Sequence, residues 1–120
     1  MKIQSYKDLI VWQRSIQLVE EIYNLTKNFP KCEEFALSSQ MKRAAISIPS
    51  NIAEGYRRKN LKEYLQFLHI SIASASELET QLIISHKIYS NINYLAADSL
   101  LNEVIKMLSV MIKNLQISKR

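Results

Sequence analysis

The sequence predicts an all-α protein built as an antiparallel up-down-up-down four-helix bundle. Its 120 residues include one glycine and two prolines, far fewer turn residues than an all-β fold of this length needs. Hydrophobic residues make up 48% of the chain. They recur in steps of three and four, which places side chains on one face of a helix. A chain of this length can bury a core without disulfides or metals, so residues 1–120 are expected to form a single domain.

The first predicted helix begins near residue 9 and ends at Pro30, whose ring and missing N–H cannot continue it. Its main apolar line is Leu9, Trp12, Ile16, Val19 and Tyr23. A second line, on an adjoining face, is Val11, Leu18, Ile22, Leu25 and Phe29. The two lines span roughly 200° of circumference, more than an ordinary surface helix. This helix therefore needs more than one neighbour.

The second predicted helix follows Glu33 and Glu34, since acidic residues favour a helix N-terminus. Its apolar line is Leu37, Met41, Ala44, Ile48 and Ile52. Pro49 lies inside this run and predicts a kink, because one intrahelical hydrogen bond is lost there. The segment passes the single glycine, Gly55, and reaches a turn at Asn60.

The third predicted helix begins with Asn60 as N-cap and Glu63 as its reciprocal partner. Its apolar line is Leu61, Leu65, Leu68, Ile72, Ala75 and Leu82. Residues 71–76 are mostly small and would let another helix approach closely. A turn at residues 90–93 leads to the fourth helix, whose apolar line is Leu101, Val104, Leu108, Met111 and Leu115. Short connections make successive helices antiparallel.

Polar residues beside these lines predict a structural polar network of Arg43, Asn51, Glu54 and Glu79. Glu79 falls between Ala75 and Leu82 on the expected inward line, and a buried carboxylate needs a partner. Arg43 is the first candidate for that partner and Asn51 the second. Breaking such a pair costs about 3 to 5 kcal/mol, so Arg43→Ala is expected to loosen the bundle.

The net charge of +5 is concentrated in one region. Residues 41–62 contain six basic residues and the single acid Glu54, which equals the excess of the whole chain. One interpretation is a footprint for an anionic partner such as RNA or DNA. The other is an ordinary solvated helix end. The candidate nucleic-acid-binding residues are Lys42, Arg57, Arg58, Lys59 and Lys62.

No catalytic or metal-binding pattern is recognisable in the sequence. Di-iron bundles carry Glu-x-x-His pairs, whereas Gln66 and Ile83 stand three residues before His69 and His86. Zinc-ligand clusters, phosphate-binding loops and nucleophile elbows are also missing. We therefore expect no enzyme activity, metal or cofactor.

The lone Cys32 cannot form an internal disulfide, and no charged-then-apolar leader follows Met1. These two features predict a cytoplasmic protein. The longest uncharged run, residues 64–76, is shorter than the roughly 18 to 20 apolar residues of a membrane span.

Five segments carry a family resemblance: DLIVW at 8–12, FP at 29–30, QMKRAA at 40–45, IPSNIAEG at 48–55 and SELET at 76–80. The chain resembles the four-helix-bundle proteins encoded in intervening sequences of bacterial large-subunit (23S) rRNA genes. It is also similar to the accessory proteins of diversity-generating retroelements. The resemblance implies a ring-like homopentamer with a basic surface for nucleic acid, and for the retroelement relatives it implies a reverse transcriptase and its RNA as partners. Ala75 departs from the glycine often seen at that position.

Two functional hypotheses follow. The first is a non-enzymatic, oligomeric protein that binds nucleic acid, RNA in particular, through its backbone, because nothing in the sequence is suited to reading bases. The second is a protein-interaction scaffold whose basic region docks an acidic protein partner.

Overall fold

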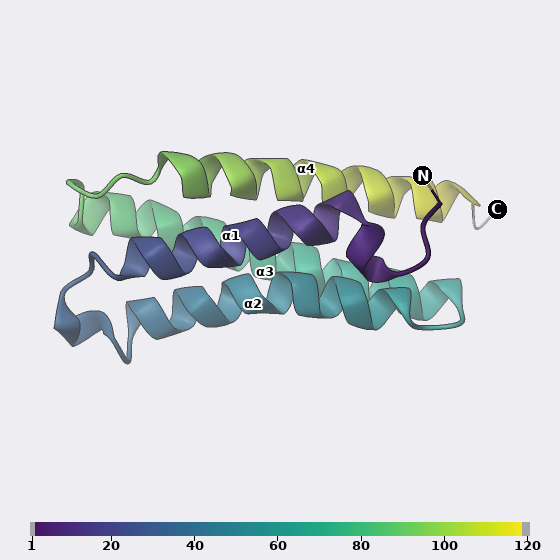
Figure 1. Ribbon diagram of the computed structural model, residues 1–120, viewed down its shortest axis with the longest axis horizontal. Coiled ribbons are helices and arrows are strands. Elements are labelled where there is room, and N and C mark those ends of the chain that lie inside the picture. Colours follow the sequence, from purple (N-terminus) through teal and green to yellow (C-terminus); the bar gives the residue numbers. More distant parts are fainter. Residues whose placement is uncertain (1, 119–120) are drawn as a thin grey trace.

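Four long helices lie side by side in the computed structural model, which describes residues 2–118 (Figure 1). The helices are α1 (Ile10–Thr26), α2 (Leu37–Tyr56), α3 (Leu61–Ile88) and α4 (Leu95–Ser118), with two 3-10 helices, η1 (Tyr6–Asp8) and η2 (Lys31–Glu33). No strand occurs within residues 2–118. Successive helices run in opposite directions, α1 and α3 each contact α2 and α4, and α1 does not contact α3. The predicted all-α four-helix bundle is confirmed.

The helix boundaries follow local hydrogen bonding. The predicted cap of α3 is present, since the Asn60 side chain accepts from the Glu63 backbone N–H at 2.8 Å and donates to the Glu63 carboxylate at 2.7 Å. Two other boundaries differ from the prediction. Helix α1 ends at Thr26 rather than at Pro30, and α2 begins at Leu37, after the residues around Glu33 have formed η2.

Of the two apolar lines predicted for the first helix, the second is the one that packs in the core. Val11, Leu18, Ile22, Leu25 and Phe29 are all buried. The main predicted line is only half-buried from Leu9 to Val19, and Tyr23 at its end is exposed. Because α1 contacts both α2 and α4, its broad apolar arc has the two neighbours that its width requires.

Helices α2 and α3 make the most extensive contact in the bundle. Ser71 donates to the Ile48 carbonyl at 2.9 Å, and the Ser47 and Ser74 hydroxyls lie 2.8 Å apart. The small residues of α3 thus permit a close approach, as predicted. Helix α2 continues through Pro49 without a break, and the kink stays a prediction.

The predicted pairing of Arg43 with Glu79 is wrong. The buried line of α3 steps from Ala75 to Leu78 and then to Leu82, so the side chain of Glu79 is exposed, and that of Arg43 is exposed as well. Among residues 2–118, no ion pair or hydrogen bond joins Glu79 to Arg43 or to Asn51. A helical line can continue from Ala75 by three residues to Leu78 or by four to Glu79, and the packing of α3 buries Leu78.

The remaining members of the predicted network have local partners. The Asn51 amide donates to the Ser47 carbonyl at 2.8 Å and to its hydroxyl at 3.0 Å. Glu54 pairs with Arg58 one turn later at 3.2 Å. Asn51 and Glu54 therefore each have a partner one helical turn away in the chain, and neither contacts Glu79. Within residues 2–118, no helix combines the length and hydropathy needed to cross a membrane.

Candidate nucleic-acid interface

Four of the five candidate basic residues lie together where α2 turns into α3. Arg57 follows the last residue of α2, Arg58 and Lys59 form the turn, and Lys62 lies in the first turn of α3. All four side chains are exposed. They stand at the end of the bundle where α4 also ends (Figure 1).

Lys42 does not belong to this cluster. It precedes Arg57 by about four turns of α2, roughly 22 Å along the helix axis. Its ammonium lies 4.8 Å from the centre of the Tyr23 ring of α1. The sequence grouped it with the others by proximity in the chain, and the length of α2 between residues 42 and 57 separates them.

The N-terminal segment adds a basic residue that the sequence analysis missed. The Ser5 side chain accepts from the Lys7 N–H at 3.0 Å, and the Asp8 carboxylate accepts from the Ser5 N–H at 3.2 Å, so a capping box holds η1. This places Tyr6 against Arg57, with 5.2 Å between the guanidinium and the ring centre. The Lys7 ammonium lies 6.0 Å from the centre of the same ring, so Lys7 joins the group. The signal in the sequence for the turn that holds it was the Ser-x-x-Asp pattern of residues 5–8. We define the basic end as Lys7, Arg57, Arg58, Lys59 and Lys62.

Arg58 is held by carboxylates, unlike the other members of the basic end. Its guanidinium lies 3.2 Å from Glu54 and 3.8 Å from Glu63, and 4.8 Å from the centre of the Phe67 ring. Within residues 2–118, no ion pair involves the other four. Arg58 therefore organises the turn, while the remaining cations are available for a partner.

Two aromatic side chains pack against each other beside the turn between α2 and α3. Tyr56 and Tyr64 meet edge to face with 6.1 Å between their ring centres. Burial, with a smaller contribution from Tyr56, raises the pKa of Tyr64 to about 12. Its hydroxyl stays protonated at physiological pH and adds no negative charge beside the cations.

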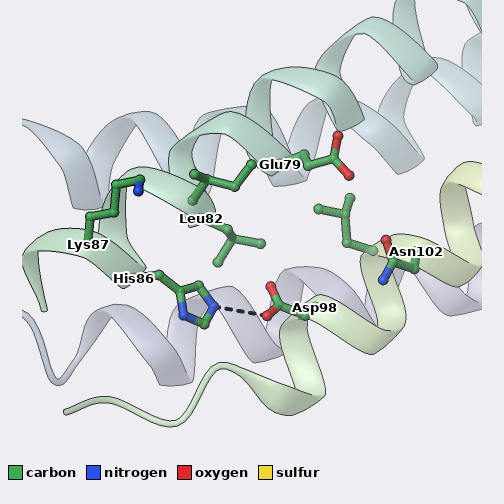
Figure 2. A pocket seen from close by; sticks show the side chains of 8 residues that line it. Glu79, Leu82, His86, Lys87, Asp98 and Asn102 are labelled. Atoms are coloured by element: carbon green, nitrogen blue, oxygen red, sulfur yellow. Dashed lines mark hydrogen bonds and ion pairs between the residues drawn. The ribbon is translucent and has the colours of Figure 1, made fainter. Parts of the chain in front are cut away.

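A separate cavity of about 400 Å³ lies between the end of α3 and the start of α4 (Figure 2). His86 and Asp98 meet there, with 2.9 Å between the imidazole Nε2 and the carboxylate. The same imidazole stacks on Tyr94, with 3.9 Å between the ring centres. This contact joins the last turn of α3 to the first turn of α4.

Glu79 lines this cavity together with Lys87 and Asn102. The Glu79 side chain, which the sequence predicted to face the core, therefore lies at this cavity instead. Within residues 2–118, no three His, Cys, Asp or Glu side chains are grouped so that they could hold a metal ion.

A family model describing the 23S rRNA-intervening sequence protein matches residues 7–110. The chain belongs to the 23S rRNA-intervening sequence protein family. The matched span includes the whole basic end and most of the bundle. A solved structure from Bacteroides thetaiotaomicron VPI-5482, described as a protein of unknown function from the S23 ribosomal protein family, is similar with a TM-score of 0.75 and 28% identity. The similarity covers 87% of this chain and 99% of that chain.

Part of the sequence-based interpretation is not tested by these comparisons. No curated protein matches the chain significantly. The similarity to accessory proteins of diversity-generating retroelements stays a prediction. Family membership, together with the four-helix fold, agrees with the resemblance to the 23S rRNA-intervening sequence proteins.

Proposed function

We propose that this member of the 23S rRNA-intervening sequence protein family is a non-enzymatic, cytoplasmic homo-oligomer that binds RNA through its basic end. The observation that supports this proposal is the gathering of Lys7, Arg57, Lys59 and Lys62 at one end of the bundle, with no ion pair to any of them within residues 2–118. Arg and Lys side chains that neutralise phosphates dominate the affinity of proteins for nucleic acids. The family resemblance further implies a homopentamer, which would repeat the basic end around a ring.

The proposed contact is with the RNA backbone rather than with base edges. Exposed lysines at a turn can reach phosphates, and phosphate contacts position a protein on nucleic acid without carrying sequence information directly. Lys42, on the side of the bundle, would make a separate and weaker contact. We therefore expect recognition of charge and shape, with little preference for sequence.

Gel-shift titration with a structured RNA at two ionic strengths tests the proposal. The parent protein is compared with the double variant Lys59→Ala/Lys62→Ala and with the control Lys27→Ala/Lys31→Ala. The control removes two exposed lysines from the opposite end of the bundle, so its net charge equals that of the first variant. We expect the first variant to lower the slope of log affinity against log salt by about 2 per protomer. The control should bind like the parent, and no binding by the parent at low salt would overturn the proposal.

One observation favours a second candidate function, the docking of an acidic protein. Arg58 already holds two carboxylates, those of Glu54 and Glu63, so the basic end can accept carboxylate groups. A partner that stays bound to the tagged protein after nuclease treatment, and is lost from Lys59→Ala/Lys62→Ala, would support this alternative.

A further inference from the structure

An apolar groove of about 610 Å³ runs between the start of α1 and the second half of α4. The apolar residues of this α1–α4 groove are Leu9, Ile10, Met107, Val110, Met111 and Leu115. Ile10 and Val110 are 59% and 57% exposed. Exposed apolar patches framed by polar residues mark interaction surfaces, and methionines adapt their shape to a partner.

The rim of this groove is positively charged. Lys106 lines it, and Lys113 follows seven residues later on the same face of α4, with Val110 between them. Within residues 2–118, neither lysine takes part in an ion pair, and no acidic residue lines the groove. The surface therefore suits an apolar helix face that carries negative charge.

Helix α3 presents such a face. Ile70, Ile84 and Ile88 are 43%, 42% and 59% exposed, and Glu77 lies midway between the first two on the same side of the helix. We name these four residues the α3 stripe. The Glu77 carboxylate accepts a hydrogen bond from Gln81 at 3.2 Å but has no ion pair within residues 2–118.

The stripe and the groove are different surfaces of one molecule. Helix α3 has no contact with α1, and the stripe residues do not line the cavity that α3 shares with α4. A second copy can therefore bring its stripe to the groove of the first while its own groove stays open. Such heterologous contacts repeat from copy to copy and close into rings when the rotation permits.

We infer that this chain assembles head to tail, with the α3 stripe of one copy seated in the α1–α4 groove of the next. The inference rests on the proposed homo-oligomer and names its contact surfaces. Glu77 of one copy faces the lysine rim of the other, whereas contact of groove with groove would bring Lys106 and Lys113 of both copies together. Placement of an apolar helix face in an apolar groove is an established mode of recognition.

Light scattering coupled to size-exclusion chromatography tests this assembly with two full-length variants. Val110→Glu damages the groove and leaves the stripe intact, and Ile84→Glu does the reverse. Both positions are exposed, so the bundle is expected to fold, which circular dichroism checks. Ile10→Glu and Ile88→Glu serve as second variants of each surface. Asn24→Glu, at an exposed position of α1 outside both surfaces, is the control.

We expect the parent and Asn24→Glu to be oligomers and each of the two variants to fall to the mass of one protomer. An equimolar mixture of Val110→Glu and Ile84→Glu should give a 1:1 heterodimer, because one intact stripe meets one intact groove. Variants that stay oligomeric, or monomeric variants that do not combine when mixed, overturn the inference and leave the proposed oligomer standing. A monomeric parent overturns both, while RNA binding is judged separately by the gel shift.

Discussion

The Arg57 guanidinium lies 5.2 Å from the centre of the Tyr6 ring, and this contact fastens the N-terminal 3-10 helix to the end of α2. The same ring meets Trp12 edge to face, with 5.3 Å between the ring centres. Tyr6 thus joins η1, α1 and α2 through one side chain. The shape of the basic end depends on it, because Lys7 is positioned by the same turn.

Replacement of Tyr6 by leucine should lower the free energy of unfolding by about 1 to 2 kcal/mol, since it removes an aromatic pair and a cation–π contact. Urea denaturation measures the change. Tyr23→Leu is the matched control, because Tyr23 has a cation–π contact with Lys42 at 4.8 Å but no aromatic pair within residues 2–118. Equal losses in both variants would show that the Tyr6–Trp12 pair contributes nothing.

Gly55→Ala should destabilise the bundle. A Cβ at this position would lie 2.8 Å from the Phe67 Cβ and 3.0 Å from the Tyr64 ring. The Phe67 atom is the base of its side chain and cannot move without α3. The gain in helix propensity, about 1 kcal/mol, is opposed by an overpacking cost of about 1 to 3 kcal/mol.

A lower thermal midpoint for Gly55→Ala is therefore expected. Ser50→Ala, at an exposed position of the same helix, is the control and should leave the midpoint nearly unchanged. A midpoint above that of the parent would mean that α2 and α3 separate there at little cost.

The helices could be predicted because each buries a line of side chains at the spacing that defines a helix. The Asn60 cap was also predictable, since it depends on residues three apart. The exposure of Glu79 could not be predicted, because a step of three and a step of four both continue a helical line. Only the packing of α3 against its neighbours decides that Leu78 rather than Glu79 is buried.

The candidate site shows the same division between local and distant contacts. The cluster of Arg57, Arg58, Lys59 and Lys62 is local in the chain and was found. The Ser-x-x-Asp pattern of residues 5–8 indicates the local turn that holds Lys7, but the Tyr6–Arg57 contact that brings this turn to the site spans some fifty residues and has no local signal. Lys42 was included because it is near in sequence, although a helix separates residues along its axis.

Arg43→Ala is now expected to change the free energy of unfolding by less than about 0.5 kcal/mol, as for other exposed positions. The buried pair expected from the sequence alone predicts a loss of about 3 to 5 kcal/mol. Urea denaturation distinguishes these values. Ile48→Ala, in the buried line of the same helix, provides the reference for a true core loss of about 2 to 5 kcal/mol.

Stability should fall as the pH rises from about 10 to about 12. The hydrogen bond that the Tyr89 hydroxyl donates to Glu33, 2.5 Å long, is the main cause that raises the pKa of Tyr89 to about 12. Burial is the main cause that raises the pKa of Tyr64 to about 12. In this range the unfolded chain loses protons that the folded chain retains, so the free energy of unfolding decreases with pH.

Urea midpoints between pH 8 and pH 11 measure this decrease. Tyr89→Phe removes one of the three tyrosines whose pKa is raised, Tyr64, Tyr89 and Tyr94, and should flatten the dependence above pH 10. A parent whose midpoint is constant up to pH 11 would contradict the expectation.

Glu54→Gln should strengthen RNA binding if the basic end is the site of contact. Glu54 is the nearer of the two carboxylates that hold Arg58, at 3.2 Å against 3.8 Å for Glu63. Its neutralisation raises the charge of the basic end by one and frees one side of the guanidinium for a phosphate. We expect affinity to rise by about 2- to 10-fold at low salt, with a steeper dependence on salt. Glu20→Gln, an exposed change on α1 outside the basic end, alters the net charge equally. If both variants gain the same affinity, the RNA responds to the charge of the whole molecule rather than to its basic end.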